Sequence, residues 1–519
     1  AQESRGLGDV YKRQLANFVV LMVSDFVLDP VSLGRKADRY FSGKNVRLLM
    51  SVSFEKIFRV ISNSSPEVAR LEELRLYASA YKQVAESSQA HPIKLWEKYR
   101  LRRQLELLGC RIVRSCEITD RPGEIRVLHY LTNSFPFTRS GYTERSSRII
   151  DCQRASEVTV FAVTRYNYPL SIGILKFSES DTIDGVRFYR LVPDFISPFR
   201  STQKSNAVQQ LVDLCLELKI DVLQTTTGFQ NAEIVSLAAQ ALNIPWTYEV
   251  RGELEETWVS KQSPENKHLA QRSDYFRMAR KNEEKAMRMA SSVIALSEVS
   301  KEGLIKRGIE AQKIRVIPNG IDNELLKLDF TKVAARKQLG LEEDKVYVGT
   351  VTSVVGYEGL DILIRALKYL PSNVCGVVVG DGESLDSIRT LAGSLGLADR
   401  IVLPGRKPQA EALVWYEALD VFTVPRRDTA VCQRVTPIKA TTAQALRIPV
   451  VVSDLPALRE VTGGYAVFVK PEDPRSLAKG VLSALKGDAP VAPLDWLESR
   501  SWSANGQRYS EIVRGSSHT

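Results

Sequence analysis

The chain has 519 residues, of which 44% are apolar and 25% are charged, which is the composition of an ordinary globular protein. This length allows two to four domains at about 150 residues each, and the composition excludes a disordered, collagenous or low-complexity protein. The formal charge of +10 is a mild excess that suits an acidic substrate or an anionic membrane surface. No dense block of Lys and Arg indicates a nucleic-acid partner.

Cysteine and histidine are scarce and scattered. The six cysteines include no C-x-x-C pair, which indicates a reducing, cytoplasmic compartment and disfavours structural zinc. Because only four histidines are present, a His-based metal site is not expected. We also expect no metal and no cofactor elsewhere in the protein. No apolar run reaches about 18 residues, so no segment is expected to span a membrane.

The first 123 residues fall into two segments. Residues 1–14 include SRGLGDVYKRQ, which resembles a translated sequencing adapter; we therefore expect an artefact rather than a genuine polar tail, with the natural N-terminus missing. Residues 15–123 form a predicted α/β extension of unknown role. Within it, 94–103 is basic and amphipathic, which fits either a membrane-surface helix or the solvated face of an ordinary helix.

Strand-like and helical patterns alternate from residue 124 onward. In the block 124–320 the predicted strands are 125–131, 158–163, 221–224, 245–250 and 292–296, and the predicted helices are 144–151, 231–242 and 264–290. In the block 321–490 the predicted strands are 346–351, 375–379, 401–403, 421–424 and 449–452. A return helix is expected at about 501–513, within the tail 491–519.

This alternation predicts two tandem α/β domains, each a doubly wound, Rossmann-like parallel sheet covered by helices on both faces. Ligands are expected at the carboxyl ends of the strands and in a cleft between the domains.

A glycine-rich turn, Gly380-Asp381-Gly382, follows a predicted strand and opens a helix. Its glycines would let backbone N–H groups approach a ligand, or would simply form a turn. The chain has no complete G-x-G-x-x-G with a later acidic residue, which disfavours a dinucleotide redox enzyme. It also lacks G-x-x-x-x-G-K-[ST], which excludes a P-loop NTPase.

Two further motifs carry charge. Arg426, Arg427, Arg434 and Lys439 lie before a helix predicted near residue 440, and this arrangement predicts a diphosphate site or, alternatively, a solvated basic loop. The second motif ends a strand and contains Glu249 and Arg251, which would bind sugar hydroxyls or pair with each other.

Together these motifs resemble the retaining glycosyltransferases of family 4, which have the two-domain GT-B fold. The resemblance covers about 124–512. Further motifs that support it are the Pro136/Gly141 loop, Ala295-Leu296-Ser297-Glu298, Val316 to Asp322, Tyr357-Glu358-Gly359-Leu360-Asp361 and Val435-Thr436-Pro437-Ile438-Lys439. The last two resemble the branch associated with exosortase and exopolysaccharide loci.

The resemblance implies a metal-independent transfer of a sugar from a nucleotide-sugar to a glycan or lipid-linked acceptor, with retained configuration, in cell-surface or exopolysaccharide synthesis. It implies a cytoplasmic protein with peripheral contact to the inner face of the membrane. The implied donor-binding residues are Gly141, Ser353, Gly380, Asp381, Gly382, Arg426, Arg427, Arg434, Thr436 and Lys439. The residues implied at the reacting centre and on the acceptor side are Thr226, Glu249, Arg251 and Thr442.

Several family positions are altered in this chain. The E-x7-E signature falls on Arg434 and Thr442, and the donor-site His falls on Thr226. The usual phosphate-binding Arg and Lys fall on Ser353 and Glu358. Three hypotheses stay open: an active glycosyltransferase with a modified donor site, a degenerate homologue that binds a nucleotide-sugar or partner without turnover, and a different enzyme of the same fold, such as an epimerase or phosphorylase.

Overall fold

The computed structural model describes residue 118 and residues 123–517, except 157, 175–179, 194–195, 198–199 and 329–330. The predicted artefact at 1–14, nearly all of the extension 15–123 and the basic segment 94–103 lie outside the described residues.

The chain divides into two compact units. Among the described residues, unit 1 comprises 118, 123–250, 262–293 and 510–517, and unit 2 comprises 251–261 and 294–509. This division differs from the predicted boundary after residue 320, because 251–261 and 294–320 group with unit 2.

The first sheet has eight strands in the order β3-β4-β2-β1-β5-β6-β7-β8. Its strands are β1 (Arg126–Leu131), β2 (Thr159–Thr164), β3 (Ser180–Ile183), β4 (Val186–Arg190), β5 (Val222–Thr226), β6 (Trp246–Val250), β7 (Ser292–Ala295) and β8 (Ile314–Val316). Strands β4, β2, β1, β5 and β6 are parallel, and β3 pairs with β4 in an antiparallel hairpin.

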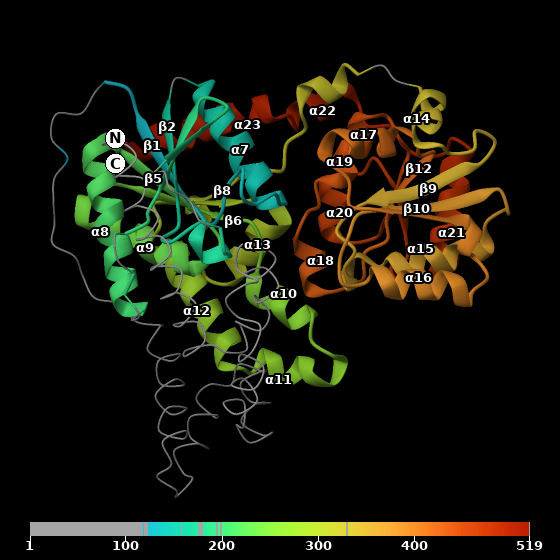
Figure 1. The fold of residues 1–519 in the computed structure, drawn as a ribbon, viewed down its shortest axis with the longest axis horizontal. Helices are drawn as coiled ribbons and strands as arrows, with labels where there is room; N and C mark the ends of the chain where they lie inside the picture. Colours follow the sequence, from blue (N-terminus) through green and yellow to red (C-terminus); the bar gives the residue numbers. More distant parts are fainter. Residues whose placement is uncertain are drawn as a thin grey trace, which may run out of the picture. The chain divides into compact units, whose positions relative to one another are not determined.

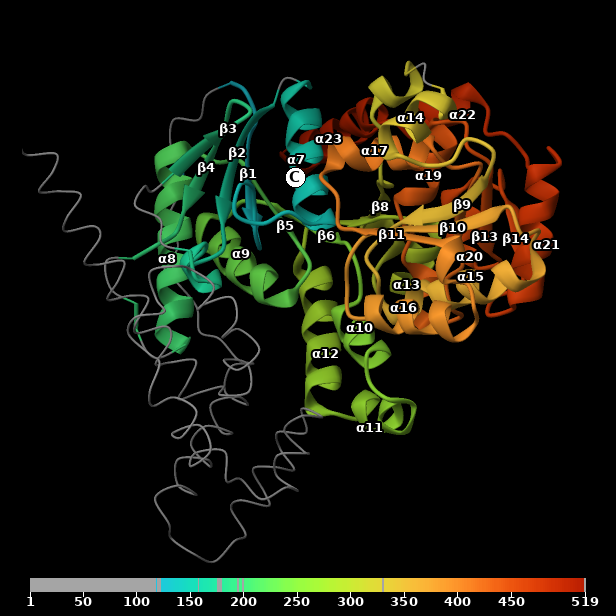
Figure 2. The same ribbon diagram turned by 45° about the vertical axis from the view of Figure 1, so that its right-hand side comes forward.

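Helices cover both faces of this sheet (Figures 1 and 2). The helices of unit 1 are α7 (Gly141–Arg154), α8 (Arg200–Leu218), α9 (Phe229–Leu242), α11 (Lys267–Gln271) and α12 (Asp274–Met289). Because side chains alternate along a strand, Val127 and Leu131 of β1 share one core with Ile150 of α7. Val513, near the end of α23 (Trp502–Ser517), joins the same core.

Unit 2 contains a six-stranded parallel sheet in the order β11-β10-β9-β12-β13-β14. Its strands are β9 (Val346–Val351), β10 (Val374–Val379), β11 (Ile401–Gly405), β12 (Val421–Val424), β13 (Val450–Ser453) and β14 (Val467–Val469). Its helices are α10 (Leu254–Ser260), α13 (Glu298–Lys306), α14 (Lys332–Leu339), α15 (Leu360–Ala366), α16 (Leu385–Ser394), α17 (Gln409–Glu417), α18 (Ala430–Arg434), α19 (Lys439–Ala445), α20 (Pro456–Val461), α21 (Pro474–Leu485) and α22 (Leu494–Ser499).

Two separate cores lie on the two faces of this second sheet. Val348 and Val378 belong to the core beneath α15 and α21, whereas Tyr347 and Val377 belong to the core beneath α17 and α19. Figure 1 shows these helices on opposite sides of the strands. The fold class is therefore as predicted: two Rossmann-like α/β domains.

One predicted helix is wrong. The segment 264–290 is not continuous, because it ends one helix at Gln271 and begins the next at Asp274. Ser273 separates the two, and its hydroxyl accepts a hydrogen bond from the Phe276 amide as an N-cap. Serine inside a polar helical pattern was the available signal for this break.

The prediction also omitted β3, β4, β8, β14 and α8. Among the described residues, no helix is both long and apolar enough to cross a bilayer.

Candidate functional site

The glycine turn after β10 is required by neighbouring backbone. Gly380 and Gly382 have φ values of 147° and 158°. A Cβ atom on Gly380 would lie 1.8 Å from the Thr352 carbonyl oxygen, and one on Gly382 would lie 2.4 Å from that of Val354. The Val354 amide also donates to the Asp381 carbonyl oxygen at 3.0 Å. The protein's own chain therefore explains both glycines, while a role for the turn in donor binding stays a prediction.

Glu358 is the centre of a buried ion cluster in unit 2. Arg426 Nη2 lies 2.8 Å from its Oε1, and Lys439 Nζ lies 3.0 Å from its Oε2. Arg426 Nη1 also donates to the Val435 carbonyl oxygen at 2.8 Å, and Lys439 Nζ donates to Thr352 Oγ1. The structure thus brings two of the four predicted donor-site cations together on one carboxylate.

The charges in this cluster control its ionisation. Burial would raise the pKa of Glu358, but Lys439 and Arg426 overcome burial and hold this pKa at about 2. Burial also disfavours a charged Arg426, yet Glu358 raises the pKa of Arg426 above its usual value. For Lys439, burial outweighs the attraction of Glu358 and the pKa is lowered. Glu358 is therefore ionised at every physiological pH.

The other two predicted cations bind different carboxylates. Arg427 Nη2 lies 2.8 Å from Asp361, and its Nη1 lies 3.4 Å from Glu472. Arg434 Nη1 lies 2.6 Å from Glu253, within unit 2. All four cations are therefore ion-paired, so a diphosphate would have to share or displace carboxylate partners. The predicted helix begins at Lys439 and is only seven residues long.

Buried threonine hydroxyls stand at two predicted positions. Thr226 and Thr436 are 3% and 5% exposed, and the Oγ1 atom of each has no hydrogen-bond partner. Such a hydroxyl is costly to bury without a partner, which suits an atom that contacts a ligand. Thr442 differs because its hydroxyl donates to the Ile438 carbonyl oxygen at 3.3 Å. Ser353 is exposed.

In unit 1, Glu249, the last residue but one of β6, forms a buried ion pair. Arg145 of α7 donates from Nε to Glu249 Oε1 at 2.8 Å, and its Nη2 lies 2.7 Å from the same oxygen. Both side chains are almost fully buried. Glu249 thus binds a partner that the sequence did not single out, because the two residues lie 104 positions apart. Arg251 is buried and belongs to unit 2.

A second buried carboxylate, Glu283 of α12, was also not among the predicted site residues. The Phe229 amide at the start of α9 donates to Glu283 Oε1 at 2.7 Å, and the Tyr248 hydroxyl donates to its Oε2. Glu283 therefore caps α9 from another helix. The sequence signal was weak, because Glu283 stands beside Glu284 in a helix rich in Lys and Arg.

Gly141 is the first residue of α7, and it is exposed. Ser140 caps this helix, and the Ser140 amide donates to Thr143 Oγ1 at 2.8 Å. A Cβ atom on Gly141 would meet nothing within 4 Å. The free protein itself therefore does not require glycine here.

In the part of the chain that the structure describes, no group of three or more His, Cys, Asp or Glu could hold a metal ion.

Two family models match most of this architecture. Residues 140–320 match the Glycosyl transferase 4-like domain, and residues 332–507 match Glycosyl transferases group 1. The chain therefore carries these two glycosyltransferase domains in tandem.

Individual relatives match over shorter stretches. The chain is 29% identical over 218 residues to D-inositol 3-phosphate glycosyltransferase of Xylanimonas cellulosilytica, covering 40% of this chain and 51% of the relative. It is 34% identical over 158 residues to the lipopolysaccharide core biosynthesis mannosyltransferase LpsB of Rhizobium meliloti, covering 29% and 43%. The chain thus spans about half the length of these curated relatives.

Solved structures share the fold. Sucrose-phosphate synthase of Thermosynechococcus elongatus has a TM-score of 0.59 at 18% identity, covering 75% of this chain and 98% of that one. Anabaena HepE in complex with UDP has a TM-score of 0.57 at 18% identity, covering 75% and 100%. At such identities the likeness establishes the GT-B fold alone.

Proposed function

We propose that the protein is a retaining glycosyltransferase that moves a sugar from a nucleotide-sugar to a glycan or lipid-linked acceptor. The observation that carries the proposal is the tandem match of both glycosyltransferase domains to two doubly wound sheets. HepE, which has the same fold, is described in complex with UDP and with UDP-glucose, which supports a nucleotide-sugar donor. LpsB and the exopolysaccharide-type motifs support a role in cell-surface polysaccharide synthesis.

In this proposal the diphosphate of the nucleotide-sugar binds beside Lys439 and Arg426. The hydroxyl of Thr436, which has no hydrogen-bond partner in the structure, donates a further hydrogen bond to it. Cationic side chains stabilise the charge that develops on the leaving diphosphate. The bond between the sugar C1 and the phosphate oxygen breaks, and C1 bonds to the acceptor oxygen on the same face. The acceptor proton passes to the departing phosphate oxygen, so the step needs neither a metal nor a strong protein base.

We place the protein in the cytoplasm, with peripheral contact to the inner membrane face where the acceptor is lipid-linked. Flotation with vesicles of anionic phospholipid tests this placement. Recovery of the protein with neutral vesicles alone, or with neither kind, would count against an electrostatic membrane contact.

A donor screen on the full chain tests the activity. UDP-, GDP-, ADP- and dTDP-sugars are added without metal, and thermal shift and sugar release or transfer are measured. A donor that stabilises the protein and is turned over supports the enzyme. Stabilisation by a donor without hydrolysis or transfer to any glycan or lipid-linked acceptor favours the degenerate binding homologue. No response to any donor contradicts the donor site.

A pair of threonine variants makes the screen specific. Thr436→Val removes a hydroxyl without a partner, so donor binding should weaken while stability stays unchanged. Thr462→Val is the matched control, because its buried hydroxyl donates to the Leu458 carbonyl oxygen at 2.7 Å. This control should lose roughly 1 kcal/mol of stability and keep its donor affinity.

A further inference from the structure

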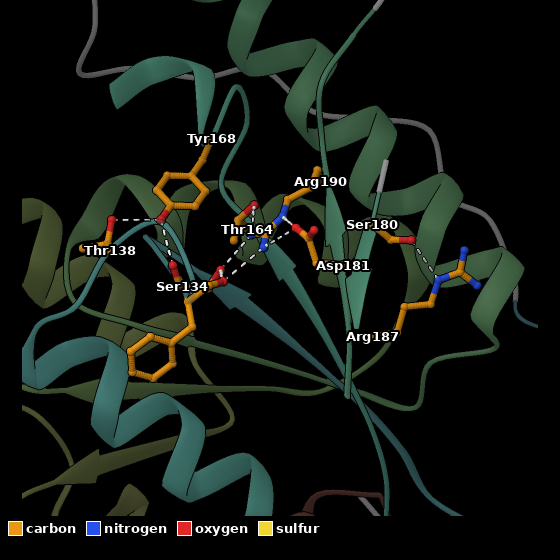
Figure 3. Close-up of polar contacts among 9 residues, drawn as sticks. Ser134, Thr138, Thr164, Tyr168, Ser180, Asp181, Arg187 and Arg190 are labelled. Atoms are coloured by element: carbon orange, nitrogen blue, oxygen red, sulfur yellow. Dashed lines mark hydrogen bonds and ion pairs between the residues drawn. The ribbon is translucent and has the colours of Figure 1, made fainter. Parts of the chain in front are cut away.

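Arg190, the last residue of β4, is buried and directed at the loop between β1 and α7 (Figure 3). Its side chain has no solvent exposure. Nε and Nη2 donate to Asp181 Oδ2 at 3.1 and 2.9 Å. On its other side, Nη1 donates to Ser134 Oγ at 2.7 Å and Nη2 to the Phe135 carbonyl oxygen at 3.3 Å. Arg190 thus ties the β3–β4 hairpin to this loop.

Tyr168 holds the same loop from a second direction (Figure 3). Its hydroxyl donates to the Ser134 carbonyl oxygen at 2.9 Å and lies 2.8 Å from Thr138 Oγ1. The Ser134 amide in turn donates to this hydroxyl at 3.3 Å. The tyrosine ring is fully buried, and the Arg190 guanidinium carbon lies 5.7 Å from its centre. We call Arg190 and Tyr168, with the residues 134–138 that they hold, the loop clamp.

Packing alone does not explain the buried arginine of the loop clamp, because a buried charge costs free energy. Burial lowers the pKa of Arg190, an effect that its contact with Asp181 opposes. Replacing a buried ion pair by well-packed apolar residues is often neutral or stabilising, so packing alone does not require an arginine. The planar guanidinium instead fixes several donors in one geometry. What the network supplies is therefore a defined conformation of residues 134–138.

The position of the loop gives that conformation a use. The loop follows the carboxyl end of β1, where open α/β sheets bind their ligands. Its clamped part includes the buried Ser134, whereas its far end reaches the exposed Gly141 with open space around it. One end is thus immobilised inside unit 1 while the other faces solvent.

We propose that Arg190 and Tyr168 are positioning residues for sugar transfer, which hold residues 134–138 so that the loop meets the substrate in one fixed geometry. The inference rests on the proposed function and names a new role within it. Neither residue contacts substrate; each acts through the loop backbone.

Conservative variants test the clamp with two independent readouts. Tyr168→Phe keeps the ring and removes only the hydroxyl. Arg190→Lys keeps the positive charge and removes the planar guanidinium with its several hydrogen-bond donors. The matched controls are Tyr189→Phe and Arg187→Lys on the same strand, where Arg187 donates outward to Ser180 at 3.1 Å (Figure 3). Hydrogen exchange reports the loop, and steady-state kinetics reports transfer.

For Tyr168→Phe we expect amide exchange in the peptide 132–140 to quicken about tenfold, with the melting temperature lowered by roughly 2–4 °C, because a buried hydrogen bond contributes about 1 kcal/mol. In both clamp variants kcat should fall at least about tenfold with little change in donor KM, because a displaced loop misplaces reacting groups. The two controls should match the wild type in exchange and in kcat.

Unchanged exchange in Tyr168→Phe overturns the clamp, and quickened exchange with unchanged kcat overturns its role in positioning. If the wild-type chain turns over no donor, the proposed function fails, and the role in transfer fails with it. The exchange measurement still decides in that case whether the clamp holds the loop.

Discussion

Replacing Glu358 by glutamine should expose the strength of the ion cluster in unit 2. The substitution keeps the shape of the side chain and removes the charge between Arg426 and Lys439. The cluster lowers the pKa of Glu358 from its ordinary value of 4.5 to about 2. At 1.36 kcal/mol per pKa unit, this shift corresponds to roughly 3 kcal/mol in favour of the ionised carboxylate. Loss of one partner from a buried ion pair costs about 3–5 kcal/mol. The two values agree in order of magnitude.

Thermal unfolding at pH 7 is the assay. A loss of this size should lower the melting temperature of Glu358→Gln by roughly 6–12 °C for a unit of this length. Asp361→Asn is the control, because its partner Arg427 is about one-third exposed and also lies near Glu472. That partly exposed pair should contribute less than about 1 kcal/mol.

Acid titration provides the refuting result. Because the folded-state pKa of Glu358 is lowered, its contribution is fully present above the unfolded value of 4.5 and is lost as the pH falls through about 2. The stability difference between wild type and Glu358→Gln should therefore shrink from pH 5 to pH 2. An equal loss in Asp361→Asn, or a difference that is independent of pH, would refute the assigned electrostatics.

Three other predictions follow from single contacts. Gly141→Ala should leave stability unchanged or raise it by up to about 1 kcal/mol, since its Cβ atom meets nothing, yet reduce transfer at least about tenfold; a fully active variant would contradict the predicted role of Gly141 in donor binding. Glu249→Gln should cost roughly 3–5 kcal/mol in urea unfolding by removing the buried carboxylate charge beside Arg145, and a cost below about 1 kcal/mol would count against that pair. The described cysteines are buried, and burial raises the pKa of the Cys215 thiol, so Cys152, Cys215, Cys375 and Cys432 should resist iodoacetamide at pH 8 in the native state, as mass spectrometry of labelled peptides would check.

The sequence predicts elements well where the hydrophobic pattern is strong. Val346–Val351 matches its predicted range at both ends, because this valine-rich segment is flanked by the polar residues Lys345 and Thr352. The β3–β4 hairpin was omitted, since its strands mix charged and apolar residues around Asp184-Gly185. That Asp-Gly pair was the available hairpin signal.

The sequence indicated which residue types belong to the candidate site, but it did not indicate which side chains pair with one another. Clustered cations before a helix indicated a charged region correctly, but the carboxylates that bind them come from distant parts of the chain. Arg426 and Glu358 are 68 residues apart, and Arg434 and Glu253 are 181 apart. No local pattern encodes such pairs, because register and loop packing determine them only after the sheet has formed.

The altered family positions look different once the fold is known. The resemblance places a phosphate-binding lysine at 358, where this chain has an acid, and that substitution by itself suggests a lost cation. In the structure, Lys439 Nζ lies 3.0 Å from the Glu358 carboxylate, so an ammonium group is still present beside this position. It comes from α19 instead of the segment that follows β9, and Glu358 holds it in place. We therefore propose that Lys439 supplies the cation that the resemblance implies at 358, and that Glu358 holds this ammonium group beside the proposed diphosphate site.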